Sequence, residues 1–148
     1  MRRASPVLRD ARSFGAFAAP PPPSLSLLEI AQEAVDWQAE AESVIACCIL
    51  PGGKTQVLAR RGALVATVYR VLRDALALLP AASLAPMATD LDELLNFHRL
   101  LVEQVVLLGF RPDSPARDRI AAQCRGGLAE PGVRLRLLCR DLGGVAEI

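Results

Sequence analysis

Apolar residues in the segment 26–50 recur at alternating intervals of three and four, which is the spacing of one face of an α-helix. Ser26 and Glu29 form a Ser-x-x-Glu capping box, whose side chains satisfy free backbone donors of a first helical turn. We therefore expect a helix from Ser26 to about Leu50, ended by Pro51 and two glycines. Its predicted buried face consists of Leu27, Ile30, Ala34, Trp37, Ala41, Val44 and Cys48.

A second long helix is predicted from about Thr55 to Leu79, because the apolar pattern resumes there and stops at Pro80. Gly62 lies in its interior, where glycine costs up to about 1 kcal/mol relative to alanine and can mark a kink. Its predicted core face consists of Val57, Leu64, Val68, Val71, Leu72, Ala75, Leu78 and Leu79.

A third long helix is predicted to begin at Thr89 or Asp90, after a proline-bracketed linker over residues 80–88. The acidic residues that follow the cap suit the positive end of a helix dipole. Gly109 is expected to stop the helix in the left-handed conformation. Its predicted core face consists of Leu91, Leu94, Leu95, His98, Leu101, Val102, Val105 and Leu108.

The last third of the chain predicts two shorter helices. Ser114 and Pro115 suit an N-cap and a first-turn proline, and that helix is expected to run to Arg125. The segment 131–142 fits either a helix or, at "VRLRL", a strand of period two, and we favour the helix. The fold class is therefore all-α: a compact bundle of four to five helices, three long and two short.

Residues 1–23 differ in composition from the rest and are expected to be a disordered N-terminal arm, with residues 24–148 as a single helical-bundle domain. The arm combines four arginines with the run Pro20–Pro23, which favours extended polyproline structure. Other interpretations of the arm are a mitochondrial presequence, a proline motif that docks on an aromatic groove, and a kinase site at Ser5 after two arginines.

Charge alternates in sign from helix to helix. Residues 24–50 carry five acids and no base, residues 51–80 are net +4, residues 81–110 net −3, and residues 111–148 net +2. In an up-down bundle, helices consecutive in sequence are antiparallel neighbours, so the alternation favours that arrangement. An exposed ion pair adds only about 0–1 kcal/mol, so the pattern selects an arrangement more than it stabilises it.

The amino-acid composition argues against several classes of function. The net charge of +1 gives no bulk attraction to nucleic acid or anionic membranes, and no uncharged apolar run reaches the length of a membrane span. The four cysteines form no Cys-x-x-Cys pair, which indicates a reducing intracellular compartment, cytoplasm or nucleus, with the mitochondrial matrix as the alternative. The hydrophobic share of 52% exceeds what one core of this size readily buries, which favours contact with another protein chain.

The ending of "ACCILPGGKT" resembles the close of a phosphate-binding loop, but its first glycine is missing. The motif Gly-x-x-x-x-Gly-Lys-Ser/Thr requires glycine at position 48, where this chain has cysteine. The motif also requires a strand before the loop, and a long helical pattern precedes it here. We interpret the stretch as a turn between two helices, capped by Thr55.

Other candidate chemistry lacks partners. His98, the only histidine, lies on an apolar helix face, and no serine lies in a nucleophile elbow. The acids Glu29, Glu33, Asp36 and Glu40 share a helix face, without the Glu-x-x-His pairs of a di-iron bundle. We expect no catalytic residue, metal or cofactor. A run of C-terminal arginines is the remaining basic feature: Arg111, Arg117, Arg119, Arg125, Arg134, Arg136 and Arg140.

The leading hypothesis is a non-enzymatic protein-interaction module, an adaptor, assembly subunit or regulator, whose partner is another protein or a second copy. The second is a small enzyme or ligand carrier with a pocket inside the bundle near His98, Trp37 and the cysteines. The third is nucleic-acid binding through the C-terminal arginines, which the intervening acids disfavour. The partner surface is predicted at the outer edges of two long helices: Leu58, Val65, Tyr69, Leu76, Phe97, Leu100 and Leu107.

Overall fold

The computed structural model describes residues 25–52, 54–80 and 85–146, and the predicted N-terminal arm, Ser5 included, lies outside them. The described residues form helices and connecting turns, with no strand among them, so the all-α prediction is confirmed and the strand interpretation of "VRLRL" is wrong. The helices are α2 (Leu27–Asp36), α3 (Gln38–Ile49), α4 (Gln56–Ala77), α5 (Ala85–Gly109), α6 (Pro115–Gln123) and α7 (Ala129–Ala146).

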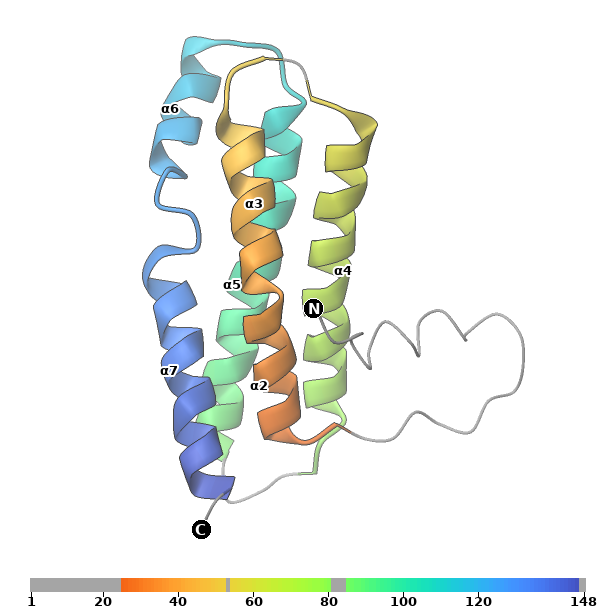
Figure 1. Ribbon diagram of the computed structural model, residues 1–148, viewed down its shortest axis with the longest axis vertical. Helices are drawn as coiled ribbons and strands as arrows, with labels where there is room; N and C mark the ends of the chain where they lie inside the picture. Colours follow the sequence, from red (N-terminus) through yellow and green to blue (C-terminus); the bar gives the residue numbers. More distant parts are fainter. Residues whose placement is uncertain (1–24, 53, 81–84, 147–148) are drawn as a thin grey trace, which may run out of the picture.

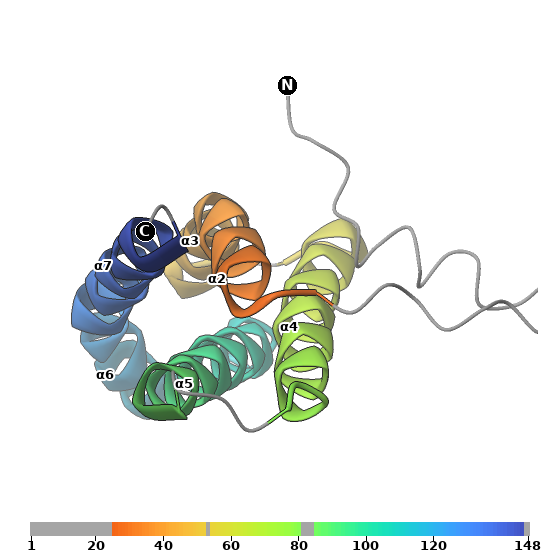
Figure 2. The same ribbon diagram turned by 90° about the horizontal axis from the view of Figure 1, so that it is seen from below.

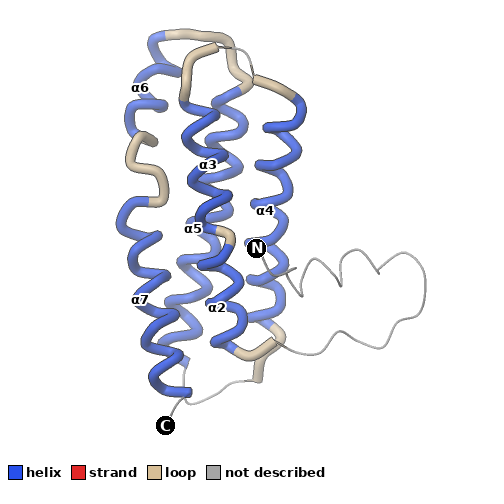
Figure 3. Tube along the Cα trace, in the orientation of Figure 1, coloured by secondary structure: helices blue, strands red, loops and turns tan. Residues whose placement is uncertain are grey.

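The helices form an up-down bundle. Helices α2 and α3 follow one another end to end, as do α6 and α7, and α4 and α5 run the length of the molecule between them in sequence (Figure 1). Seen along the bundle, the α2–α3 pair lies between α7 and α4, and α5 closes the ring (Figure 2). The turns gather at the two ends, apart from the connection between α6 and α7 and a short interruption between α2 and α3 (Figure 3).

The predicted first helix is present but interrupted at Trp37. Its capping box forms as expected, with Ser26 and Glu29 exchanging hydrogen bonds of 3.1 and 3.2 Å. Helix α2 ends at Asp36 and α3 starts at Gln38, yet Trp37 keeps the i to i−4 hydrogen bonds of a helix on both sides: it donates to the Glu33 carbonyl and accepts from the N–H of Ala41. The interruption is therefore a single residue, and Trp37 and Gln38 are both buried.

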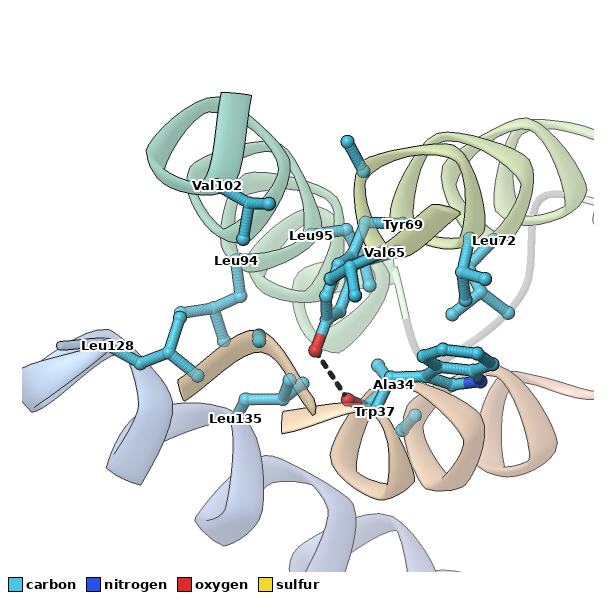
Figure 4. Packing of buried hydrophobic residues seen from close by; sticks show 14 of the residues in the cluster. Ala34, Trp37, Val65, Tyr69, Leu72, Leu94, Leu95, Val102, Leu128 and Leu135 are labelled. Atoms are coloured by element: carbon cyan, nitrogen blue, oxygen red, sulfur yellow. Dashed lines mark hydrogen bonds between the residues drawn. The ribbon is translucent and has the colours of Figure 1, made fainter. Parts of the chain in front are cut away.

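The core fills the space between the four sides of the bundle. Tyr69 of α4 is fully buried and reaches across to α2, where its hydroxyl donates a 2.8 Å hydrogen bond to the Ala34 carbonyl (Figure 4). Leu94 and Leu95 of α5 and Leu135 of α7 approach the same space (Figure 4). The predicted core faces of the first and third long helices are confirmed, with Leu27 and Leu101 partly buried at their edges.

The third long helix ends at Gly109 as predicted, but its predicted start and the predicted conformation of Gly109 are wrong. Helix α5 begins at Ala85 rather than at residue 89 or 90, because Pro86 falls in the first turn, where a missing N–H costs nothing. Gly109 is the last residue of α5 and does not adopt the left-handed conformation. It is small because α3 passes close by: a Cβ on Gly109 would lie 3.1 Å from the Cβ of Cys48.

A buried arginine ties together the end of the bundle where α3 and α5 finish. The Arg117 side chain of α6 donates hydrogen bonds to the carbonyls of Leu108, Cys48 and Leu50, at 3.2 to 3.4 Å. These carbonyls belong to the negative ends of two helix dipoles, so a cation is favourable there. Lys54 also donates to the Leu50 carbonyl.

Candidate interaction surface

Helix α4 buries a face that overlaps only in part with the one the sequence predicts. Four residues expected on its outer edge lie in the core, so that part of the prediction is wrong: Leu58, Val65, Tyr69 and Leu76. These four residues and Gly62 form a row along α4 that contains no charged residue. Because glycine has no side chain, Gly62 lets α5 approach closely. A Cβ at that glycine would lie 2.3 Å from Cγ2 of Val106.

Part of the face of α4 predicted to be core is turned to solvent, although Val68 and Leu72 of that face are buried as predicted. Val57 is 64% exposed, Leu64 42% and Leu78 86%, and Val71 is half-buried at the same heptad spacing. Because residues seven apart point in nearly the same direction from a helix, these four side chains form a row along one side of α4, with successive members about 10 Å apart. We call Val57, Leu64, Val71 and Leu78 the outer stripe.

Helix α5 contributes exposed apolar residues as the sequence predicts. Phe97, Leu100 and Leu107 are exposed, and Leu107 is the most exposed of the three at 66%. Phe97 stacks edge-on against the ring of His98 with centroids 6.1 Å apart, so part of its ring is engaged within the fold. Leu107 stands on the side of α5 that faces α4.

Between α4 and α5 lies a groove of about 380 Å³. Its residues on α4 are small or polar, and α5 supplies a carboxylate and two apolar side chains. The lining residues are Gly62, Ala63, Ala66, Thr67, Arg70, Glu103, Val106 and Leu107. We call this the α4–α5 groove. The groove was not predicted from the sequence, although the Gly62 and Ala66 pair, one helical turn apart, is a sequence signal of a close helix approach.

His98 is fully buried and has both ring nitrogens engaged. Nδ1 lies 2.7 Å from the Leu94 carbonyl oxygen and therefore donates, which leaves Nε2 to accept from the Gln38 amide at 3.1 Å. The Gln38 amide also donates to the Gly132 carbonyl at 3.0 Å and accepts from Arg136 at 3.2 Å. This network joins α3, α5 and α7 and satisfies the neutral imidazole on both sides.

The surroundings of His98 favour a structural role over catalysis. Burial lowers its pKa below the ordinary value of 6.5, the hydrogen bond to Leu94 opposes that shift, and the positive charge of Arg136 adds to it. His98 is not among the residues that line the α4–α5 groove. The observations therefore give no support to a ligand pocket built around this side chain.

The four cysteines are free thiols. Burial raises the pKa of Cys48, Cys124 and Cys139, so these thiols are protonated and poorly nucleophilic at neutral pH. Cys48 packs at the crossing of α3 with Gly109. Three of the four thus behave as small apolar side chains rather than as reactive groups.

The stretch that resembles a phosphate-binding loop is a connection between two helices. Thr55 accepts a hydrogen bond from the backbone N–H of Leu58 and caps α4, as predicted. Helix α3, not a strand, precedes the turn, and Lys54 donates to the Leu50 carbonyl at the end of that helix. The lysine therefore satisfies a helix terminus.

Charged side chains that suggested other chemistry are largely engaged in pairs between helices. Glu40 accepts a 2.7 Å hydrogen bond from Arg61, and Asp92 accepts one of 2.8 Å from Arg73, so oppositely charged consecutive helices do pair. Within the described segments, no group of three or more His, Cys, Asp or Glu residues is placed to hold a metal ion. Of the C-terminal arginines, Arg117 and Arg136 are used inside the fold.

Comparison with known protein families, with curated proteins and with solved structures finds no match for this chain. None of the helices in the described segments is long and apolar enough to cross a membrane.

Proposed function

We propose that this protein is a non-enzymatic interaction module that binds another protein chain through the outer stripe of α4, as an adaptor, assembly subunit or regulator. One observation carries the proposal: α4 buries one apolar stripe in the core, yet it keeps Val57, Leu64 and Leu78 exposed beside that stripe. Large apolar side chains gathered on one exposed side of a folded domain are typical of a surface that another chain covers. The free thiols suit a reducing compartment as the place where it acts.

The geometry of the outer stripe favours a helical partner. One apolar residue in each heptad, as in the outer stripe, supplies one of the two positions of the seam that a second helix covers by knobs-into-holes packing. The stripe extends over most of α4, from Val57 near its start to Leu78 at its C-cap. A partner helix of similar length would cover it in full.

The test is native mass spectrometry of the tagged protein purified gently from its own cells. The variant Leu64→Glu/Leu78→Glu places two charges on the outer stripe, and we expect it to lose at least about tenfold of the co-purifying partner. The matched control is Val133→Glu/Leu137→Glu, which makes the same change at two exposed apolar positions of α7. A partner that both variants retain equally would contradict the proposal.

A further inference from the structure

The α4–α5 groove carries opposite charges on its two walls. Arg70, on α4, makes no hydrogen bond or ion pair with any described residue. Glu103, on α5, accepts bonds of 3.2 and 3.1 Å from Arg99, and its side chain is still 41% exposed. The groove therefore presents a cation that no described residue pairs on one wall and, on the other wall, a partly exposed carboxylate that Arg99 also contacts.

The same face carries both a hollow and a projecting apolar side chain. The hollow exists because α4 has small residues there, Gly62, Ala63 and Ala66, opposite Val106. Leu107 stands at the groove with 66% of its surface exposed. A surface that contains both a knob and a hole can complement a copy of itself.

We propose that the α4–α5 groove is the contact through which two copies of this chain form a twofold-symmetric dimer. A twofold interface uses the same patch on both copies, so each patch must be self-complementary. Here Arg70 of one copy faces Glu103 of the second, and the reverse pair forms at the same time. Leu107 of each copy packs over the small residues of the other. The net charge of +1 leaves little repulsion between copies.

Charge is the reason for choosing a second copy over a partner of another kind. A basic or acidic partner would satisfy one wall of the groove and oppose the other. A second copy satisfies both walls. The dimer goes beyond the proposed function, since it uses the groove rather than the outer stripe, and each of the two can fail without the other.

Sedimentation equilibrium of the full chain over a range of concentrations tests the dimer. We expect reversible dimerisation with a Kd on the order of micromolar. Ala63→Trp fills the groove at an exposed helix position and is expected to weaken dimerisation at least about tenfold. Ala122→Trp, the same change at an exposed position of α6, should leave it unchanged.

Charge reversal identifies the contact more closely. Arg70→Glu and Glu103→Arg should each weaken self-association by about tenfold, because like charges then meet across the twofold axis. An equimolar mixture of the two variants should dimerise as well as the wild type, since both cross-pairs are then restored. A chain that stays monomeric at all concentrations, a dimer indifferent to Ala63→Trp, or a mixture no tighter than its components would overturn the proposal.

Discussion

Helix α4 carries two apolar stripes that differ by one residue in register. Leu58, Val65 and Leu72 repeat every seven residues and face the core, while Val57, Leu64 and Val71 repeat beside them on the outer side. The two sets have nearly the same composition, so hydrophobicity alone does not decide which is buried. The residues three and four positions away from each stripe decide which stripe is buried.

We call Leu58, Val65 and Leu72 the inner stripe. The residues beside it, Gly62, Tyr69 and Leu76, are uncharged, whereas charged residues lie beside the outer stripe. Arg60 and Asp74 follow Val57 and Val71 by three residues, on the side away from the inner stripe, and both are exposed. Burying the outer stripe would draw these two charges out of water, which costs several kcal/mol for a charge that is not fully paired. The difference teaches that charged residues in a neighbouring row can decide the orientation of a helix with two apolar stripes.

The largest effect is expected in the core beside the inner stripe. Tyr69→Ala should lower the free energy of unfolding by about 3–5 kcal/mol, because it leaves a large cavity and removes the bond to Ala34. Urea unfolding followed by circular dichroism measures it. Tyr69→Phe, which removes only the hydroxyl, should cost about 1 kcal/mol. A loss below about 1 kcal/mol for Tyr69→Ala would mean that this face is not the core.

The next effect is expected from closing the space at Gly62. Gly62→Ala should destabilise by about 1–3 kcal/mol, despite the better helix propensity of alanine, because the new methyl group collides with Val106. Gly144→Ala on α7 is the matched control, since nothing lies within 4 Å of a Cβ there, and it should be neutral or stabilising by up to about 1 kcal/mol. Equal effects in thermal melts of the two variants would argue against the close packing of α4 on α5.

A smaller effect is expected from protonation of His98. Its pKa is lowered in the folded state, so below about pH 6.5 the unfolded chain takes up a proton that the folded chain resists. Stability should therefore fall as the pH drops from 7 toward 5.5. His98→Leu should be less stable at pH 7 but should lose less on acidification, as urea unfolding at the two pH values would show. An unchanged pH dependence in the variant would remove His98 as the cause.

The smallest effect is expected on the outer stripe. Leu64→Ser and Leu78→Ser should each change the free energy of unfolding by less than about 1 kcal/mol, because these side chains are already 42% and 86% exposed. Leu72→Ser, the same change on the inner stripe, is the matched comparison and should cost several times more. Similar losses of unfolding free energy at Leu78 and Leu72 would mean that the two stripes contribute equally to stability, against this account.

Much of the fold follows from local signals in the sequence. The caps at Ser26, Thr55 and Ser114 form as predicted, because each supplies a side-chain oxygen next to an apolar-periodic run. The start of α5 was less predictable, since Pro86 is tolerated in a first turn and so does not separate linker from helix.

The candidate surface was only partly predictable. Phe97, Leu100 and Leu107 are exposed as expected, because α5 has a single dominant apolar face. On α4 the prediction combined the outer stripe with Val68 and Leu72, which are buried, since it weighed apolar spacing and not the charged residues beside the stripe. The α4–α5 groove depends on how closely two helices meet, and that distance is set by Gly62 and its neighbours on both helices.

The central claim is that Val57, Leu64 and Leu78 form a free surface, with Val71 at its edge against the core, while the stripe one residue away is the core. Thermal unfolding of two matched variants tests it most directly. Leu64→Glu/Leu78→Glu should stay folded with a Tm within a few degrees of the wild type. Leu58→Glu/Leu76→Glu should fail to fold or melt far lower, because it buries two unpaired charges. The opposite order of stability would contradict the account.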